Sequence, residues 1–221
     1  MAQVVAEAKG LLFDNDGVIV SSIASVNRCW RRWAEHYGVP NANEVQIAHG
    51  TRAVEIMEQL APGVDKEEGL RLIEDMEIAD VDDLEVLPGV RALLESLPKE
   101  RWAIVSSATW RLLIGRLKAA NLPLPERIVS GDRVVNGKPH PEPYLRGAAL
   151  VGADPADCIV VEDAPTGVSA GKAAGCRVMG VLGTHSVEEL RAAGCDWVVK
   201  SLLDVSVKPT SDGLRVTMEI I

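Results

Sequence analysis

Two aspartates one residue apart, Asp14 and Asp16, follow an apolar run and precede a glycine in the segment LLFDNDGVIV, residues 11–20. Alternate residues of a strand share a face, so the two carboxylates begin on the same side, and Gly17 allows the chain to turn sharply after them. Like charges held this close repel each other, and a cation, a shared proton or solvent in an open turn relieves the repulsion. The pair therefore indicates either a cation-assisted reaction centre or a solvated turn.

Further polar residues stand at the ends of other apolar runs or in a glycine-proline loop. Carboxylates with all-oxygen character suit a hard cation, Mg²⁺ above all, which accepts a further ligand from a phosphate. A lysine and a hydroxyl beside it supply charge and directed donors to phosphoryl oxygens. The residues predict a phosphoryl-transfer site that uses Mg²⁺. They are Ser106 and Ser107 after WAIV, Glu162 and Asp163 after CIVV, and Lys138 in VVNGKPHPEPY.

The elements that would position these residues follow from the hydrophobic pattern. From residue 88 onward short apolar runs alternate with helical segments, which predicts a parallel sheet whose strand ends carry the ligand site. Residues 21–87 show helical patterns only, with serines before the first helix. We therefore expect an α/β, Rossmann-like three-layer sandwich with a central parallel sheet, formed by residues 1–20 and 88–221, and a helical cap domain of residues 21–87 inserted after the first strand motif. The tail, residues 205–221, predicts two extended pieces joined by Ser-Asp-Gly.

Composition excludes several classes of protein. The 221-residue chain is 47% hydrophobic and 25% charged, with a net charge of -9. No apolar run approaches the ~20 residues of a membrane helix, and an acidic chain is a poor partner for nucleic acid. The start, MAQVVAEAKG, lacks the features of a signal peptide, and the four scattered cysteines suit reduced thiols. We expect a cytoplasmic protein that binds a small molecule, with no nucleic-acid or membrane partner; the oligomeric state stays open, and a monomer is compatible with the sequence.

The order of these motifs resembles a known signature. Asp14-x-Asp16-Gly17-Val18, a strand ending in Ser106, Lys138-Pro139 and Glu162-Asp163 together resemble the four motifs of the haloacid dehalogenase superfamily. The segments RWAIVSSAT, RLKAANLPLP, GKPHPEPYLRGAALVG and VVEDAPTGVSAGKAAGCRV are similar to its sugar and polyol phosphatases, the group with glycerol-3-phosphatase and 2-deoxyglucose-6-phosphatase. The likeness covers essentially the whole chain. Departures from the usual pattern are Asn15 for an apolar residue, Ser21 for an aspartate and Ser106 for a frequent threonine.

The resemblance implies a Mg²⁺-dependent phosphatase that hydrolyses small sugar or polyol phosphate monoesters through an aspartyl-phosphate. Asp14 would be the nucleophile, and Asp16 would protonate the leaving alcohol and then activate water. Ser106 would donate a hydrogen bond to the phosphoryl oxygens, and Lys138 would neutralise the phosphate and Asp14. The metal would be held by the Asp14 carboxylate, the Asp16 backbone carbonyl and Asp163, with Glu162 acting through water.

Selectivity for the alcohol is expected to come from the cap. The polar break HGTR, residues 49–52, interrupts its helices, and similar phosphatases place polar cap residues there. We therefore expect His49 and Arg52, together with Ser107 of the core, to bind substrate, with Arg52 as a bidentate partner of an anionic substrate.

Three alternatives remain open. A phosphomutase of the same superfamily, similar to β-phosphoglucomutase, would use the same motifs. A dehalogenase would lack an acid at the position of Asp16. A non-catalytic metabolite-binding or scaffold protein with the same fold would commonly lose the nucleophile, the lysine or the metal-binding acid, and the chain retains all three.

Overall fold

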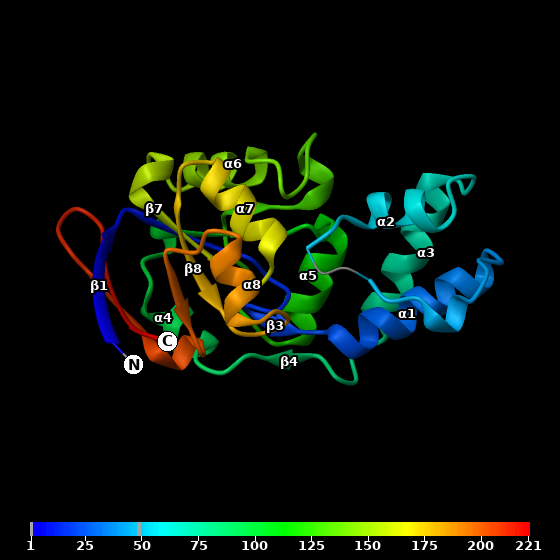
Figure 1. The fold of residues 1–221 in the computed structure, drawn as a ribbon, viewed down its shortest axis with the longest axis horizontal. Coiled ribbons are helices and arrows are strands. Elements are labelled where there is room, and N and C mark those ends of the chain that lie inside the picture. Colours follow the sequence, from blue (N-terminus) through cyan, green and yellow to red (C-terminus); the bar gives the residue numbers. More distant parts are fainter. Residues whose placement is uncertain (1, 48–49) are drawn as a thin grey trace.

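The computed structural model describes residues 2–47 and 50–221. Helices lie on both faces of a large sheet, and a group of helices lies to one side of it (Figure 1). Two further strands, β3 (Val20–Ser21) and β4 (Glu85–Val86), form a small separate sheet. The strands of the large sheet are β1 (Ala2–Ala8), β2 (Gly10–Phe13), β5 (Trp102–Val105), β6 (Ile128–Val129), β7 (Cys158–Glu162), β8 (Arg177–Val181), β9 (Trp197–Val199), β10 (Val205–Pro209) and β11 (Leu214–Ile220). The α-helices are α1 (Ile23–His36), α2 (Ala53–Leu60), α3 (Lys66–Ala79), α4 (Val90–Ser96), α5 (Trp110–Ala119), α6 (Glu142–Leu150), α7 (Pro165–Ala173) and α8 (Val187–Ala192).

The large sheet has the order β1-β11-β9-β8-β7-β2-β5-β6, with β10 also paired to β11. The part from β9 to β6 is parallel, and β2 lies between β5 and β7 with Phe13 opposite Ile104 and Val161. The predicted α/β sandwich is confirmed. One correction concerns the sheet, which is mixed, because β1 and the two tail strands join it in antiparallel pairs. Strand β1 was not predicted, whereas the two extended pieces of the tail were.

Alternate residues of the strands build two cores. Leu11 and Phe13 of β2 pack in the core that contains Leu113 of α5, on the face covered by α4 and α5. Leu12 points the other way and packs in the core that contains Ala148 of α6, on the face covered by α6, α7 and α8. Because both faces are covered, the central parallel strands are buried throughout, as in other doubly covered sheets. The sheet is therefore a rigid base for the residues that follow its strands.

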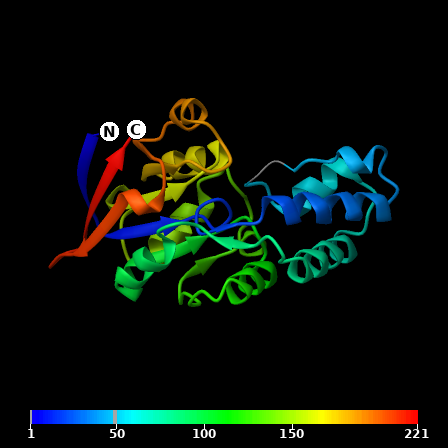
Figure 2. The same cartoon turned by 90° about the horizontal axis from the view of Figure 1, so that it is seen from below.

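Helices α1, α2 and α3 form a separate core beyond the end of the sheet (Figure 2). Trp33 and Trp30 of α1 are fully buried against Met57 of α2 and Ile73 of α3. The indole of Trp33 also donates a hydrogen bond to the Gly69 carbonyl at 2.9 Å, which fixes α1 against α3. No helix in the described ranges is long and apolar enough to cross a membrane.

The chain enters and leaves this helical part through β3 and β4, which pair antiparallel. The prediction that residues 21–87 are helical throughout is wrong at Glu85–Val86, where the return strand needs an extended backbone to pair with β3. We propose this strand pair as the junction between the core, residues 1–20 and 88–221, and the cap, residues 21–87. The cap also rests on the core through α3 and α5, where a Cβ at Gly115 would lie 3.0 Å from Ile78.

Candidate active site

The ends of neighbouring strands bring Asp14 and Glu162 together. Asp14 follows β2 and Glu162 is the last residue of β7, and these strands are parallel neighbours, so their carboxyl ends meet at one edge. Lys138, from the loop before α6, donates hydrogen bonds to Asp14 Oδ1 at 2.8 Å and to Glu162 Oε1 at 2.7 Å. All three side chains are almost completely buried. A buried lysine between two carboxylates is therefore the centre of the site.

Glu162 has both of its oxygens occupied. Oε1 also accepts a hydrogen bond from the Tyr144 hydroxyl at 2.7 Å, and Oε2 accepts from the backbone N–H groups of Asp163 and Ala164. A Cβ at Gly167 would lie 1.6 Å from Oε1, so only glycine fits beneath this carboxylate. The structure thus shows Glu162 holding Lys138; its expected contact with a metal through water stays a prediction.

The residues fit a divalent cation. Oxygen atoms of Asp14, Glu162 and Asp163 lie within 4.8 Å of one another. Asp163 is fully buried, and among the described residues its Oδ1 has no hydrogen-bond partner, although Thr184 donates to Oδ2 at 2.6 Å. A Cβ at Gly17 would lie 1.9 Å from Asp163 Oδ2, so the turn after Asp16 must pass directly over this carboxylate. A buried carboxylate oxygen without a hydrogen-bond partner, next to other carboxylates, is a suitable ligand for a hard cation.

The pKa values of these groups reflect the crowding. Burial raises the pKa of Asp14 well above its ordinary value, against the opposing effect of Lys138, and Glu162 and Asp163 raise it further. Burial and the neighbouring Glu162 raise the pKa of Asp163 to about 7. Burial alone would lower the pKa of Lys138, but Asp14 and Glu162 outweigh it and raise that pKa. Several buried carboxylates thus share one ammonium, and a bound cation would relieve the remaining repulsion.

The two serines after β5 have different partners. Ser106 is buried, and its Oγ accepts a hydrogen bond from the Ala108 N–H at 3.1 Å. The Ser107 hydroxyl instead donates to the Gly50 carbonyl of the cap at 2.6 Å. Both serines line the cavity described below. The phosphate contact of Ser106 stays a prediction, and Ser107 joins the core to the cap.

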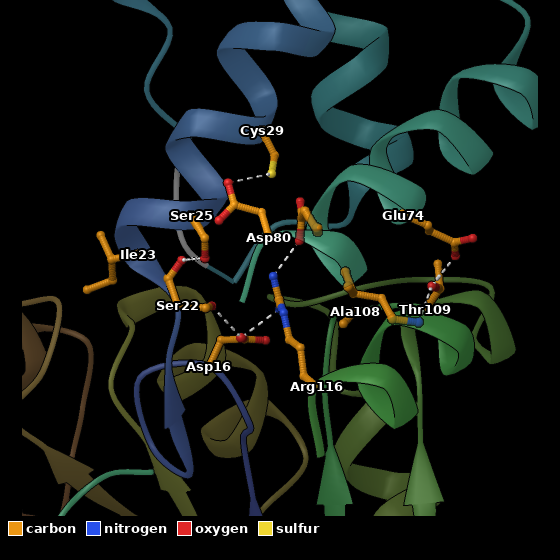
Figure 3. A network of polar contacts seen from close by, with 12 residues as sticks. Asp16, Ser22, Ile23, Ser25, Cys29, Glu74, Asp80, Ala108, Thr109 and Arg116 are labelled. Atoms are coloured by element: carbon orange, nitrogen blue, oxygen red, sulfur yellow. Dashed lines mark hydrogen bonds and ion pairs between the residues drawn. The ribbon is translucent and has the colours of Figure 1, made fainter. Parts of the chain in front are cut away.

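Asp16 lies on the side of the site that faces the cap. Its Oδ1 accepts hydrogen bonds from Arg116 at 2.6 Å and from the Ser22 hydroxyl at 3.0 Å (Figure 3). The other arm of the Arg116 guanidinium bonds to Glu77 of α3. Burial raises the pKa of Glu77 to about 7, while Arg116 lowers it and Asp16 raises it. The structure therefore adds Arg116 and Glu77 to the predicted site residues.

A cavity lies between core and cap, and the space between its lining atoms is about 680 Å³ when the open solvent at its mouth is included. Its lining includes Asp14, Asp16 and Ser106 from the core, and Trp30 and Ile73 from the cap. The apolar cap wall and the carboxylates of the core thus face each other across one cavity.

Of the two predicted cap residues, only Arg52 can be placed relative to this cavity. His49 lies outside the described residues. Arg52 is not in the lining of the cavity: its guanidinium pairs with Glu55 and donates to the carbonyls of Val134 and Val135 at 3.4 Å and 3.2 Å. These partners occupy the donors that a substrate would need, so a substrate contact of Arg52 has no geometric support.

Asn15, the departure between the two aspartates, is fully buried. Its side-chain nitrogen and oxygen have no hydrogen-bond partner among the described residues. An unpaired buried amide costs about 1–3 kcal/mol. The turn that presents Asp14 and Asp16 thus carries a local cost that an apolar residue would avoid.

Sequence reasoning missed Arg116, Glu77, Tyr144 and Thr184. A signal was present for the first two, because a charged residue occupies a position of the buried helix face in each case. Arg116 follows Leu112 by four residues on α5, and Glu77 follows Ile73 by four residues on α3. Opposite charges on the buried faces of two helices indicate an ion pair between them.

Together, strand-end carboxylates, a buried lysine and an open cavity form a centre for phosphoryl transfer. A model of the haloacid dehalogenase-like hydrolase family matches residues 11–181. Hexitol phosphatase A of Escherichia coli (strain K12) is 38% identical over 210 residues, which cover 93% of this chain and 96% of that protein. Glycerol-1-phosphate phosphohydrolase 2 of Saccharomyces cerevisiae is 34% identical, with coverages of 86% and 81%. The crystal structure of a hydrolase from Pseudomonas syringae has a TM-score of 0.77 at 25% identity, over 89% of this chain and 95% of that chain.

This chain belongs to the haloacid dehalogenase-like hydrolases. The membership predicted from the four motifs is confirmed, and the two named relatives are phosphatases of the kind that the motifs indicated. A divalent cation is typical of this superfamily, and the carboxylate cluster of Asp14, Glu162 and Asp163 fits one.

Proposed function

We propose that the protein is a Mg²⁺-dependent phosphatase of small sugar or polyol phosphate monoesters that works through an aspartyl-phosphate. The observation that carries the proposal is the buried cluster in which Lys138 contacts both Asp14 and Glu162, with Asp163 in the same group of oxygens. The names of the two relatives, a hexitol phosphatase and a glycerol-1-phosphate phosphohydrolase, support a polyol phosphate as substrate.

The reaction has two steps. In the first, the Asp14 carboxylate attacks phosphorus, the bond from phosphorus to the alcohol oxygen breaks, and Asp16 gives its proton to that oxygen. In the second, water attacks the aspartyl-phosphate, Asp16 takes a proton from the water, and the bond between phosphorus and Asp14 breaks. Lys138 balances the charge of Asp14 and of the phosphoryl group in both steps, and Ser106 donates to a phosphoryl oxygen.

Asp14, Asp163 and the Asp16 carbonyl would hold Mg²⁺, with Glu162 behind them. When bound, the ion supplies positive charge that reduces the repulsion between the anionic nucleophile and the anionic phosphate. Thr184 keeps Asp163 in place for this task through the hydrogen bond to Oδ2. The cytoplasmic location and the absence of nucleic-acid and membrane partners remain predictions, and the oligomeric state stays open.

Hydrolysis is favoured over phosphomutase activity by the two named relatives, both of which remove phosphate. Both reactions share the first step and differ in whether water or a second alcohol receives the phosphoryl group. A non-catalytic role is disfavoured because Asp14, Lys138 and Asp163 lie together at hydrogen-bonding or metal-binding distance.

A substrate panel tests the proposal. The purified protein is incubated with hexitol phosphates, glycerol phosphates, hexose phosphates and nucleotides, and inorganic phosphate and isomeric products are followed by ³¹P NMR. We expect phosphate release to be fastest with a polyol or sugar phosphate, to stop in EDTA and to return with Mg²⁺. Isomer formation without phosphate release would identify a phosphomutase, and undiminished turnover after exhaustive chelation would contradict the role of the metal.

A further inference from the structure

Arg116 joins the carboxylate of Asp16 to a carboxylate of the cap. It lies on α5 of the core, and 6% of its side chain is exposed. One arm of its guanidinium donates to Asp16 Oδ1 at 2.6 Å, and the other donates to Glu77, whose side chain is also 6% exposed. Figure 3 shows the Arg116 guanidinium between Asp16, on the core side, and the helices of the cap. The contact is thus buried and bridges two parts of the chain.

The Arg116 bridge is one of several contacts between core and cap. Core and cap are also joined by Thr109 with Glu74, by Arg111 with Glu74 and Asp75, and by Ser107 with the Gly50 carbonyl. None of these contacts involves Asp16. Burial of a guanidinium is costly unless its donors are paired, and Glu77 alone would supply a charged partner. Arg116 nevertheless uses one arm of its guanidinium to bind Asp16.

The two carboxylate oxygens of Asp16 also differ in their hydrogen bonds. Oδ1 accepts from two donors, Arg116 and the Ser22 hydroxyl, whereas Oδ2 has no hydrogen bond among the described residues. Arg116 cannot give up its proton at any working pH, so it always acts as a donor. A proton on Oδ1 would point at a donor hydrogen of Arg116. The catalytic proton must therefore sit on Oδ2.

We propose that Arg116 is a positioning residue for Asp16: with Ser22 it fixes Oδ1, so that Oδ2 carries the proton to and from the alcohol and the water, and Glu77 holds the other arm of the guanidinium. This inference rests on the proposed phosphatase function and assigns a task within that site. Arg116 donates its hydrogen bonds to Asp16 and Glu77, so its task concerns the proton transfers of Asp16 and not the attack of Asp14 on phosphorus.

The test uses two substrates that differ in their need for a proton. A polyol phosphate has a poor leaving group, whereas the nitrophenolate of para-nitrophenyl phosphate leaves without protonation. The value of kcat/KM covers the steps up to release of the alcohol, so it isolates this proton transfer from the later attack of water. The variants are Arg116→Met, Arg116→Lys and Asp16→Asn. Arg111→Met is the matched control, because Arg111 lies on the same helix and bonds to the cap without touching Asp16.

We expect Arg116→Met to lower kcat/KM for the polyol phosphate about 100-fold, in the range of general acid catalysis, with most of the loss in kcat. The value for para-nitrophenyl phosphate should fall less than about fivefold. Asp16→Asn should show the same dependence on the leaving group, Arg116→Lys should recover part of the loss, and Arg111→Met should leave both values near those of the parent. Equal losses on both substrates, or a rise in KM alone, would overturn the assignment and make Arg116 a structural or a substrate-binding residue.

A second variant keeps the test decisive if Arg116→Met does not fold. Glu77→Gln retains the shape and an acceptor for Arg116 but removes the charge that holds its second arm. We expect this variant to show the same preferential loss on the polyol phosphate, by about five- to tenfold. If folded Glu77→Gln kept the parent's ratio of kcat/KM values for the two substrates, Glu77 would not act on Asp16 through Arg116. Failure of the proposed function would look different, because the parent protein would then hydrolyse neither substrate or would remain active as Asp14→Asn.

Discussion

The proposed phosphate end of the active site and its proposed leaving-group end are supported by different parts of the chain. At the phosphate end, Asp14 and Glu162 follow strands of one sheet, and Lys138 reaches them from a core loop. At the leaving-group end, Asp16 depends on Arg116 from a core helix, which in turn is held by Glu77 from the cap. The groups that we propose to bind the phosphate thus rest on a rigid sheet, whereas those that we propose to meet the alcohol rest on the contact between two parts of the molecule.

The largest expected effect lies at the phosphate end. Asp14→Asn removes the proposed nucleophile but keeps the size of the side chain, so we expect kcat to fall about 10⁴-fold or more for every substrate. Acid-quenched parent enzyme should carry phosphate on Asp14 when analysed by mass spectrometry, and the variant should carry none. If the fall in kcat depended on the leaving group of the substrate, the two ends of the site would not have the separate roles that we propose.

The next effect concerns the hold on the metal. Thr184→Val keeps the shape of the side chain and removes the donor to Asp163 Oδ2, so we expect Mg²⁺ affinity to fall about 10- to 100-fold. The midpoint of Mg²⁺-dependent thermal stabilisation should move by the same factor as the midpoint of activation. The control is Thr210→Val, because Thr210 lies in the turn between β10 and β11, away from the site. An unchanged Mg²⁺ midpoint would show that Asp163 keeps its place without Thr184.

At the leaving-group end, Glu77 makes stability depend on pH. Its pKa of about 7 in the folded protein lies above the ordinary value of 4.5, so the folded state binds this proton more tightly than the unfolded state does. The parent chain therefore loses stability as pH rises from about 4.5 to about 7, and the loss is complete above that range. Glutamine does not titrate. We expect the melting temperature of Glu77→Gln, relative to the parent, to rise on the order of 5 °C between pH 5 and pH 8. If the difference in melting temperature between Glu77→Gln and the parent did not change with pH, ionisation of Glu77 would not lower the free energy of unfolding.

The smallest effect is expected at Arg52, which contacts the loop before Lys138 without lining the cavity. Arg52→Ala removes hydrogen bonds to two carbonyls of that loop, Val134 and Val135. We expect KM to change less than about threefold, and equally for polyol phosphates and para-nitrophenyl phosphate, because exposed or partly exposed contacts of this kind contribute little. A large rise in KM for the polyol phosphate alone would restore Arg52 as a substrate ligand.

The same contrast explains what the sequence could predict. Asp14, Glu162 and Asp163 could be predicted to lie together because short apolar runs between helical patterns locate the strands, and the ends of parallel strands converge. Lys138 was predicted from its place in a Gly-Lys-Pro loop. The fold class followed from the same alternation. The antiparallel pairing of β1 with β11 was not accessible in this way, because it joins the two ends of the chain and no local pattern encodes that distance.

Arg116 and Glu77 illustrate the second limit. Each occupies a buried helix position that the pattern would reserve for an apolar residue, but the identity of the partner depends on how α3 packs against α5. That packing is set by small residues such as Gly115, which admits Ile78. For Arg52 the local pattern was misleading. A polar break between helices indicated a substrate contact, but the side chain contacts Glu55 and carbonyls of the core instead.

The paired strands β3 and β4 make the cap exchangeable in principle. Its two ends lie side by side, with Val20 opposite Val86 and Ser21 opposite Glu85, so the core requires of an inserted segment only that its ends meet. Insertions between adjacent strand ends add little entropic cost as they grow longer. A chimera carrying another cap would inherit Asp14 and Lys138 unchanged but would lose Glu77. Grafted enzymes of this architecture should therefore keep a carboxylate opposite Arg116 if they are to release poor leaving groups as well as good ones.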